Sequence, residues 1–199
     1  NSQICPKGAD VRHQEQSQPM QIVESVIKIN EEIKHRMVDR IFQMLHDDLV
    51  GKTITIFGVT FKPGTDDMRD APALAIVPAL VGRGANVRVV DPQGQTEGAA
   101  LLPGVTWVDD AYVAAKDSDL VVVLTEWNEF RLLDLSAISS QMNTPRLADL
   151  RNIYSPEQAL QAGFREYISI GRASVSNPDD ITAEYPIRSA AGVKKEKRQ

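Results

Sequence analysis

The 199-residue sequence has one cysteine, three histidines and no long apolar run, and each shortage excludes a class of protein. Cys5 cannot form an internal disulfide, which fits a reducing compartment and excludes a disulfide-stapled scaffold. The histidines are scattered, and no Cys/His cluster has the spacing of metal ligands. A Ser-His-Asp arrangement is not recognisable either. The sequence therefore predicts neither a metal site nor a serine hydrolase.

Segments for membrane insertion or export are also missing. The apolar stretches at 71–81 and 120–124 are far shorter than the roughly 20 residues that cross a bilayer. Residues 1–18 lack the basic start and apolar run of a signal peptide. The net charge of -5 argues against a nucleic-acid partner, because nucleic-acid-binding domains are usually basic. We therefore expect a cytoplasmic protein that binds neither membrane nor nucleic acid.

A long amphipathic helix is predicted over residues 20–49. Apolar residues recur there every three or four positions, and charged residues fill the other face. At about 1.5 Å per residue, the helix is roughly 44 Å long. One small domain cannot easily cover such a stripe, so we expect it to pack on another domain or subunit. Gly51 is the predicted stop signal.

From residue 51 onward, short apolar runs alternate with helical patterns. Strands are predicted at 52–59, 86–90, 105–108, 120–125, 146–149 and 166–170, and helices at 71–83, 110–116, 135–142 and 156–162. This alternation predicts an α/β fold, a parallel sheet with helices on both faces, preceded by one long α-helix. We divide the chain into a flexible leader (1–19), the helix (20–50), the α/β domain (51–172) and a disordered tail (173–199). The basic end of that tail is interpreted as a solvated segment rather than a nucleic-acid or lipid contact.

The loop after the first strand is the first candidate site, because parallel sheets bind ligands beyond the carboxyl ends of their strands. Residues 58–72 (GVTFKPGTDDMRDAP) lack the fingerprint G-x-G-x-x-G, which is absent from the whole chain. A complete NAD site is therefore not expected. Lys62 and Arg69, with the start of the next helix, form either a diphosphate cradle or a loop with surface charges.

Other strand ends carry weaker candidates. Asp91 ends the second strand, where an acid either holds a ribose hydroxyl or simply closes the strand before proline. Trp127 follows the fourth strand and either walls a nucleotide pocket or packs in the core. Arg151 follows the fifth strand, within reach of an anionic ligand or a neighbouring subunit.

Five linked segments resemble a known family. Residues 58–72 resemble the signature of the C-terminal domain of the UDP-glucose/GDP-mannose dehydrogenase family. Residues 124–133 (LTEWNEFRLL), 149–156 (DLRNIYSP) and 169–172 (SIGR) are similar to its bacterial UDP-glucose dehydrogenase branch. Residues 29–34 resemble the family's long central helix. The resemblance covers about residues 19–172.

The resemblance implies a Rossmann-like domain that binds UDP-glucose or a related nucleotide sugar, and a homodimer through the long helix. The whole enzyme oxidises the sugar C6 alcohol to a carboxylate in two NAD-dependent steps, with a cysteine thiolate capturing the aldehyde. NAD belongs to a separate N-terminal domain whose glycine-rich loop is absent here. We therefore expect the nucleotide-sugar-binding part of an oxidoreductase, inactive alone, in a polysaccharide-precursor pathway.

Site residues carry over by motif. Phe61, Lys62 and Arg151 match the family's substrate contacts, and Arg69 matches an arginine that reaches NAD. Cys5 is the catalytic candidate, but the family's nucleophile lies in G-G-x-C-F-P-K-D, of which the glycines, Phe and Asp are missing here. Cys5 is either a remnant of that motif or a coincidence.

Two alternatives remain open. The chain is either a non-catalytic module that binds a UDP-sugar or only dimerises, or part of a GDP-mannose or UDP-N-acetylmannosamine dehydrogenase. The stretches at 125–127 and 151–154 favour UDP-glucose.

Overall fold

The computed structural model describes residues 21–176. The chain divides between residues 33 and 34 into two compact units, which are described separately. The predicted leader and most of the predicted tail lie outside the described residues. No helix within residues 21–176 is long and apolar enough to cross a membrane.

The first helix, α1, spans Gln21–Met44 and is shorter than predicted. It ends before Leu49 because His46 and Asp47 adopt positive φ angles of 54° and 59°. The amide of Asp47 then donates to the carbonyl of Phe42 at 2.9 Å, a bond typical of a helix end. Leu49 is buried beyond this turn, so the apolar pattern continues past the last helical residue. Periodicity alone therefore overestimates the length of the helix.

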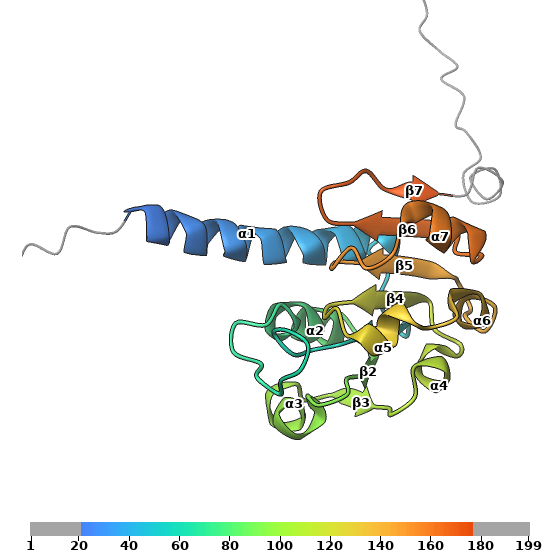
Figure 1. The fold of residues 1–199 in the computed structure, drawn as a ribbon, viewed down its shortest axis with the longest axis horizontal. Helices are drawn as coiled ribbons and strands as arrows, with labels where there is room; N and C mark the ends of the chain where they lie inside the picture. Colours follow the sequence, from blue (N-terminus) through green and yellow to red (C-terminus); the bar gives the residue numbers. More distant parts are fainter. Residues whose placement is uncertain (1–20, 177–199) are drawn as a thin grey trace, which may run out of the picture. The chain divides into compact units, whose positions relative to one another are not determined.

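A seven-stranded sheet is the centre of the unit that begins at residue 34, and its order is β3-β2-β1-β4-β5-β6-β7 (Figure 1). The strands are β1 Thr53–Phe57, β2 Asn86–Val90, β3 Val105–Trp107, β4 Leu120–Val123, β5 Arg146–Asp149, β6 Glu166–Ser169 and β7 Val175–Ser176. The first six pair in parallel, and β7 pairs antiparallel with β6. The predicted α/β class with a parallel sheet is confirmed.

Helices cover both faces, as predicted. They are α2 Ala73–Gly82, α3 Gln95–Leu101, α4 Ala111–Ala115, α5 Asn128–Arg131, α6 Leu135–Ser139 and α7 Pro156–Gln161. Alternate residues of β4 enter different cores, because successive side chains of a strand point to opposite faces. Leu120 and Val122 pack with Ile41 of α1 and Ile76 of α2. Val121 and Val123 join the core that includes α4, α6 and α7.

Three short elements were not predicted: α3, α5 and β7. Helix α3 lacks an apolar stripe and contains Gly98, where an added Cβ would lie 2.5 Å from a ring carbon of Trp107. The glycine is thus required by packing, and its helix carries little periodic signal. Strand β7 extends the sheet beyond residue 172, the predicted end of the domain. Its two residues are too few for a pattern.

The strand order defines where a ligand can bind. From the middle of the sheet, β1, β2 and β3 follow one another toward one side, and β4, β5 and β6 follow one another toward the other side. The order reverses between β1 and β4, and ligands of such sheets bind beyond the carboxyl ends at this switch point. The segments after β1, β4 and β5 therefore share one edge.

Candidate functional site

The loop from β1 to α2 is anchored tightly at its first residue. Gly58 has a φ of 81°, and a Cβ there would lie 2.4 Å from the Cβ of Thr125 after β4. The hydroxyl of Thr125 also donates to the carbonyl of Thr60 at 2.6 Å. The start of the loop is therefore packed directly against the end of β4, across the switch point.

Asp91 stabilises this loop from the end of β2. Its Oδ2 accepts hydrogen bonds from the amides of Val59 and Thr60 at 2.7 and 3.2 Å. Four more donors reach the same carboxylate: the Thr60 hydroxyl, the Trp127 indole and the amides of Gln93 and Gly94. A carboxylate offers about four lone-pair sites, so these donors leave none for a ribose. The ribose hypothesis for Asp91 is therefore wrong, and the residue closes the strand and holds the loop.

Trp127 packs in the core. Only 5% of it is exposed, and it belongs to the same apolar cluster as Phe130. Its indole N–H donates to Asp91 at 3.3 Å. The packing interpretation of Trp127 therefore replaces that of a pocket wall.

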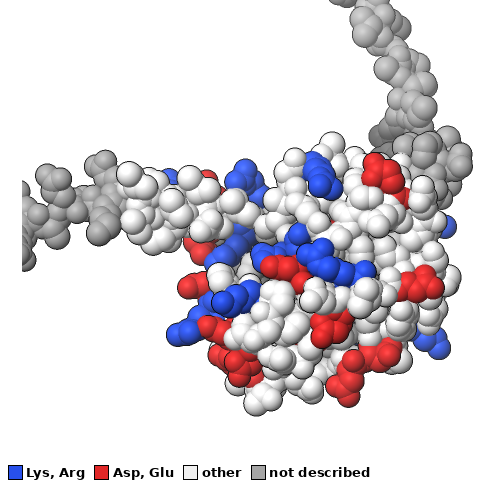
Figure 2. All heavy atoms as spheres, viewed as in Figure 1, with Lys and Arg blue, Asp and Glu red and all other residues white. Residues whose placement is uncertain are grey.

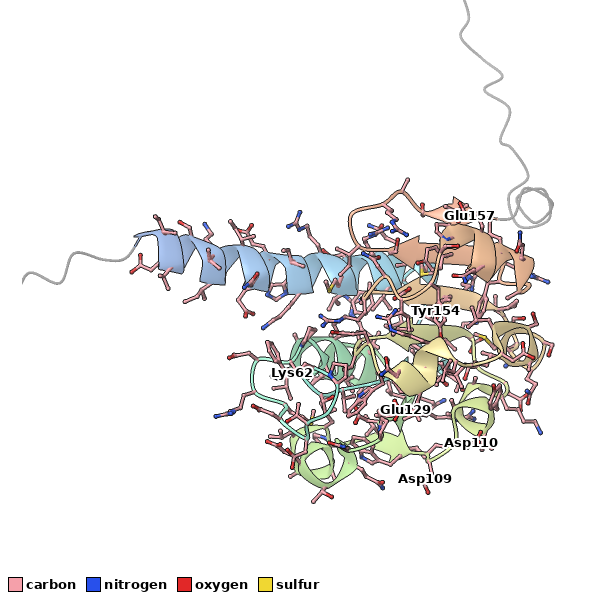
Figure 3. All side chains as sticks on the ribbon, in the orientation of Figure 1. Lys62, Asp109, Asp110, Glu129, Tyr154 and Glu157 are labelled. Atoms are coloured by element: carbon pink, nitrogen blue, oxygen red, sulfur yellow. The ribbon has the colours of Figure 1, made fainter. Side chains whose placement is uncertain are left out.

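Phe61 and Lys62 lie farther along the loop and face solvent. Phe61 is 48% exposed, and its amide donates to the carbonyl of Asp67. Lys62 is exposed and forms no hydrogen bond with another described residue, although its charge acts on Asp67. Figure 3 shows Lys62 on this loop. An exposed ring beside an exposed ammonium is suited to a ligand that carries both an apolar and an anionic part.

Arg69 is paired with Asp67 in the same loop. Its Nε and Nη2 donate to the two carboxylate oxygens of Asp67 at 3.0 and 2.7 Å, and its amide donates at 2.9 Å. The side-chain and then the backbone hydrogen bonds of Arg69 lower the pKa of Asp67 to about 2. The side-chain bond also raises the pKa of Arg69. The guanidinium is nevertheless 85% exposed at the loop surface.

Arg151 lies on the turn after β5, and a buried carboxylate shapes that turn. Asp149 is fully buried and accepts bonds from the amides of Arg151 and Tyr154, at 3.1 and 2.8 Å. The Nε of Arg151 donates to Glu126, which follows β4. That hydrogen bond from Arg151 is the main cause that lowers the pKa of Glu126. Strands β4 and β5 are neighbours, so the two residues meet although they are far apart in sequence.

The sheet thus brings Phe61, Lys62 and Arg69 to one loop and Arg151 to a turn at the same edge. Cys5 lies outside the described residues. Sequence reasoning missed Glu126 as the partner of Arg151, and the signal that could have found it is its position directly after a predicted neighbouring strand. Figure 2 shows Lys and Arg side chains gathered across the middle of one face.

A cavity of about 540 Å³ opens beyond β2 and β3. Asp91, Asp109, Asp110 and Glu129 contribute to its lining, which contains no Lys, Arg or His among the described residues. Figure 3 shows Asp109 and Asp110 before α4 and Glu129 on α5. Four carboxylates repel a phosphate, so the cationic edge fits a diphosphate better than this cavity does.

The described residues do not provide two other kinds of site. Within 21–176, no group of three or more His, Cys, Asp or Glu side chains is placed to hold a metal ion. A Rossmann-type NAD site does not fit either, because the chain lacks the glycine fingerprint and Asp91 has no acceptor left for the ribose.

An open, mostly parallel sheet with helices on both faces and a switch point in its strand order places this chain in the class of Rossmann-like domains. The chain belongs to the UDP-glucose/GDP-mannose dehydrogenase family, whose UDP binding domain matches residues 55–156. This confirms the resemblance seen in the sequence.

Several relatives are named UDP-glucose 6-dehydrogenase. The protein of Rhizobium meliloti is 43% identical over 159 residues, which are 80% of this chain and 36% of that protein. The TuaD protein of Bacillus subtilis is 35% identical over 169 residues, covering 84% of this chain and 36% of the relative. This chain therefore spans about a third of the length of these relatives.

Solved structures agree on the fold. A UDP-glucose dehydrogenase from Pyrobaculum islandicum superposes with a TM-score of 0.63 at 26% identity, covering 77% of this chain and 33% of that one. The UDP-D-ManNAc dehydrogenase of Pyrococcus horikoshii, at 24% identity, has a TM-score of 0.65 over 79% of this chain and 35% of its own. The second likeness shows the fold alone.

Proposed function

We propose that this chain binds the UDP part of UDP-glucose, or of a related nucleotide sugar, as the C-terminal part of an NAD-dependent UDP-glucose 6-dehydrogenase. The observation that carries the proposal is the position of Lys62 after β1 and of Arg151 after β5, both at the carboxyl ends of parallel strands in a family UDP binding domain. Two cations at that edge match the charge of a diphosphate, and Arg can bind phosphate oxygens in pairs.

The side chains take distinct roles in this proposal. Lys62 supplies a point charge to the nucleotide sugar, and the exposed ring of Phe61 covers its apolar part. Arg151 holds phosphate oxygens from the β5 side. Arg69 reaches NAD that is bound elsewhere, and Cys5 is the candidate nucleophile that captures the aldehyde. The proposal also places the protein in the cytoplasm, because its single cysteine fits a reducing compartment.

The experiment that tests the site is calorimetric titration of the chain with UDP. Lys62→Ala should weaken binding by about tenfold or more, because a charge-assisted contact to phosphate is lost. Lys116→Ala is the matched control, since this exposed lysine lies before β4, at the opposite edge of the sheet. Equal affinities of wild type and Lys62→Ala would contradict the assignment of the loop.

Catalysis is a separate question, and a non-catalytic UDP-binding module is the second candidate. The missing glycine fingerprint favours inactivity of the isolated chain under both candidates. We expect the pure chain to form no NADH from UDP-glucose and NAD. The measurement is the absorbance of the reduced nicotinamide at about 340 nm. Steady NADH formation that Cys5→Ser abolishes would refute both the inactivity and the second candidate.

A homodimer through α1 is part of the proposal. Five apolar residues in the first part of the helix are about half exposed or more: Ile22, Val23, Val26, Ile27 and Ile29. Such a stripe marks a surface that binds another protein, and a second copy of the chain offers the same stripe.

A further inference from the structure

We propose that Glu126 is a positioning residue for Arg151: it holds the Nε edge of the guanidinium and so presents the two terminal nitrogens to the phosphates of the nucleotide. The inference deepens the proposed function and rests on it. The contact joins the segments after β4 and β5, and neither family membership nor the motifs of the sequence assign Glu126 a role.

The backbone of Arg151 is fixed without Glu126. Asp149 accepts bonds from the amides of Arg151 and Tyr154. The hydroxyl of Tyr167 lies 2.9 Å from the carbonyl of Tyr154 and 3.3 Å from Asp149, and it shares its one proton between them. Burial, followed by the charge of Asp149, raises the pKa of Tyr167 to about 12, so its hydroxyl stays a donor. The Tyr154 hydroxyl also donates to the carbonyl of Phe130. Removing the Glu126 carboxylate therefore leaves the turn in place and frees only the Arg151 side chain.

The contact of Glu126 leaves part of the guanidinium available. Only the Nε of Arg151 donates to Glu126, and its terminal nitrogens have no hydrogen-bond partner among residues 21–176. Arg69 differs, because Asp67 occupies both its Nε and its Nη2. The two pairs also differ in exposure: the Arg151 side chain is 31% exposed and that of Arg69 is 85% exposed. Arg151 is thus held in place with its outer nitrogens open.

Two physical effects of Glu126 on an anion have opposite signs. As a negative charge near the site, it repels phosphate, and its removal would tighten binding. As the partner of Nε, it orders a long side chain before the ligand arrives, and its removal would weaken binding because the ligand then bears the ordering cost. The half-buried, directly bonded geometry favours the second effect.

The test is UDP titration of five variants: Glu126→Ala, Glu126→Gln, Glu126→Asp, Arg151→Ala and the Glu126→Ala/Arg151→Ala double variant. Glu126→Ala should weaken UDP binding by about fivefold, because the ligand then bears the entropic cost of ordering one long side chain. Glu126→Gln keeps the acceptor without the charge and should bind like wild type or slightly tighter. Glu126→Asp keeps the charge but loses the reach and should weaken binding.

The double variant shows whether Glu126 acts through Arg151. In the Arg151→Ala background, Glu126→Ala should no longer weaken binding, whereas a general structural effect would persist. The inference is overturned if Glu126→Ala binds as tightly as wild type, or if it weakens binding equally in both backgrounds. If the alanine variant fails to fold, the affinities of the Gln and Asp variants decide. Tighter UDP binding by Glu126→Asp than by Glu126→Gln overturns the inference.

Failure of the proposed function would look different. If wild type does not bind UDP, or if Arg151→Ala binds like wild type, the assignment of the site itself is wrong and this inference falls with it. If Arg151→Ala weakens binding and Glu126→Ala does not, only the role of Glu126 is refuted.

Discussion

Each of the two arginines of the candidate site is paired with a carboxylate, and the two pairs differ in geometry. Asp67 binds the Nε and one terminal nitrogen of Arg69 within one loop, whereas Glu126 binds only the Nε of Arg151 from a neighbouring strand end. The first pair joins residues that are two apart, and the second joins residues 25 apart. The second pair forms because β4 and β5 are neighbours in the sheet.

The Asp67–Arg69 pair leads to a prediction for the acid range. The pKa of Asp67 is lowered from 3.8 to about 2, so the interaction is present above pH 3.8 and is lost as the pH falls toward 2. Arg69→Ala should move the pKa of Asp67 back toward 3.8, measured by carboxyl NMR titration. Lys62→Ala is the matched control and should shift it much less, because its charge is the weakest of the causes. An unchanged Asp67 midpoint in Arg69→Ala would contradict the pairing.

The residue types of the site were predictable from sequence, but their partners were not. Lys62 could be placed at a strand end because a β-branched run, TITIF, marks the strand that precedes it. Arg151 follows a short strand, RLAD, that has no such run. The sequence left the role of Asp91 open between a ribose contact and a closed strand, because its six donors come from three different segments, which no local pattern shows. The carboxylate of Glu126 was missed for the same reason.

At the scale of elements, the strands were predicted best and the helix ends worst. Strand β4 (LVVV) is buried along its whole length, which produces a continuous apolar run that is easy to recognise. The end of α1 depends on left-handed residues after Met44, and the apolar pattern continues through that turn. Short helices such as α5 bury only one of their residues, Phe130, and therefore carry no periodic signal.

The contact between the β1–α2 loop and the end of β4 gives a second prediction. Gly58→Ala places a Cβ 2.4 Å from Thr125, in addition to the strain of a φ of 81°. Overpacking and left-handed strain together should lower the free energy of unfolding by about 2–4 kcal/mol, measured by urea denaturation. Gly64→Ala is the matched control in the same loop, because its φ is 77° but nothing lies within 4 Å of the new Cβ. It should cost only about 1 kcal/mol. Equal losses for both variants would show that Thr125 does not constrain the loop.

At the scale of the whole molecule, the division into leader, helix, domain and tail stays a prediction. The apolar stripe of α1 is used differently along its length: Ile41 and Met44 are buried in the core, whereas Ile22 and Ile29 are 81% and 50% exposed. The same periodicity therefore continues into exposed residues of the unit that ends at residue 33. A stripe that is half core and half surface is the pattern expected when a second copy completes the burial.

Self-association gives the last prediction. Wild type should sediment at about twice 22.0 kDa, and Ile22→Lys/Ile29→Lys should sediment as a monomer, because four added charges per dimer would have to be buried. Leu132→Lys is the control, since this residue is 84% exposed on the sheet-containing unit. Both substituted isoleucines are exposed in the single chain. The unfolding midpoint of the sheet-containing unit should therefore stay unchanged. A wild-type monomer at high concentration, or a dimer that survives both lysines, would show that the stripe serves something other than a second copy.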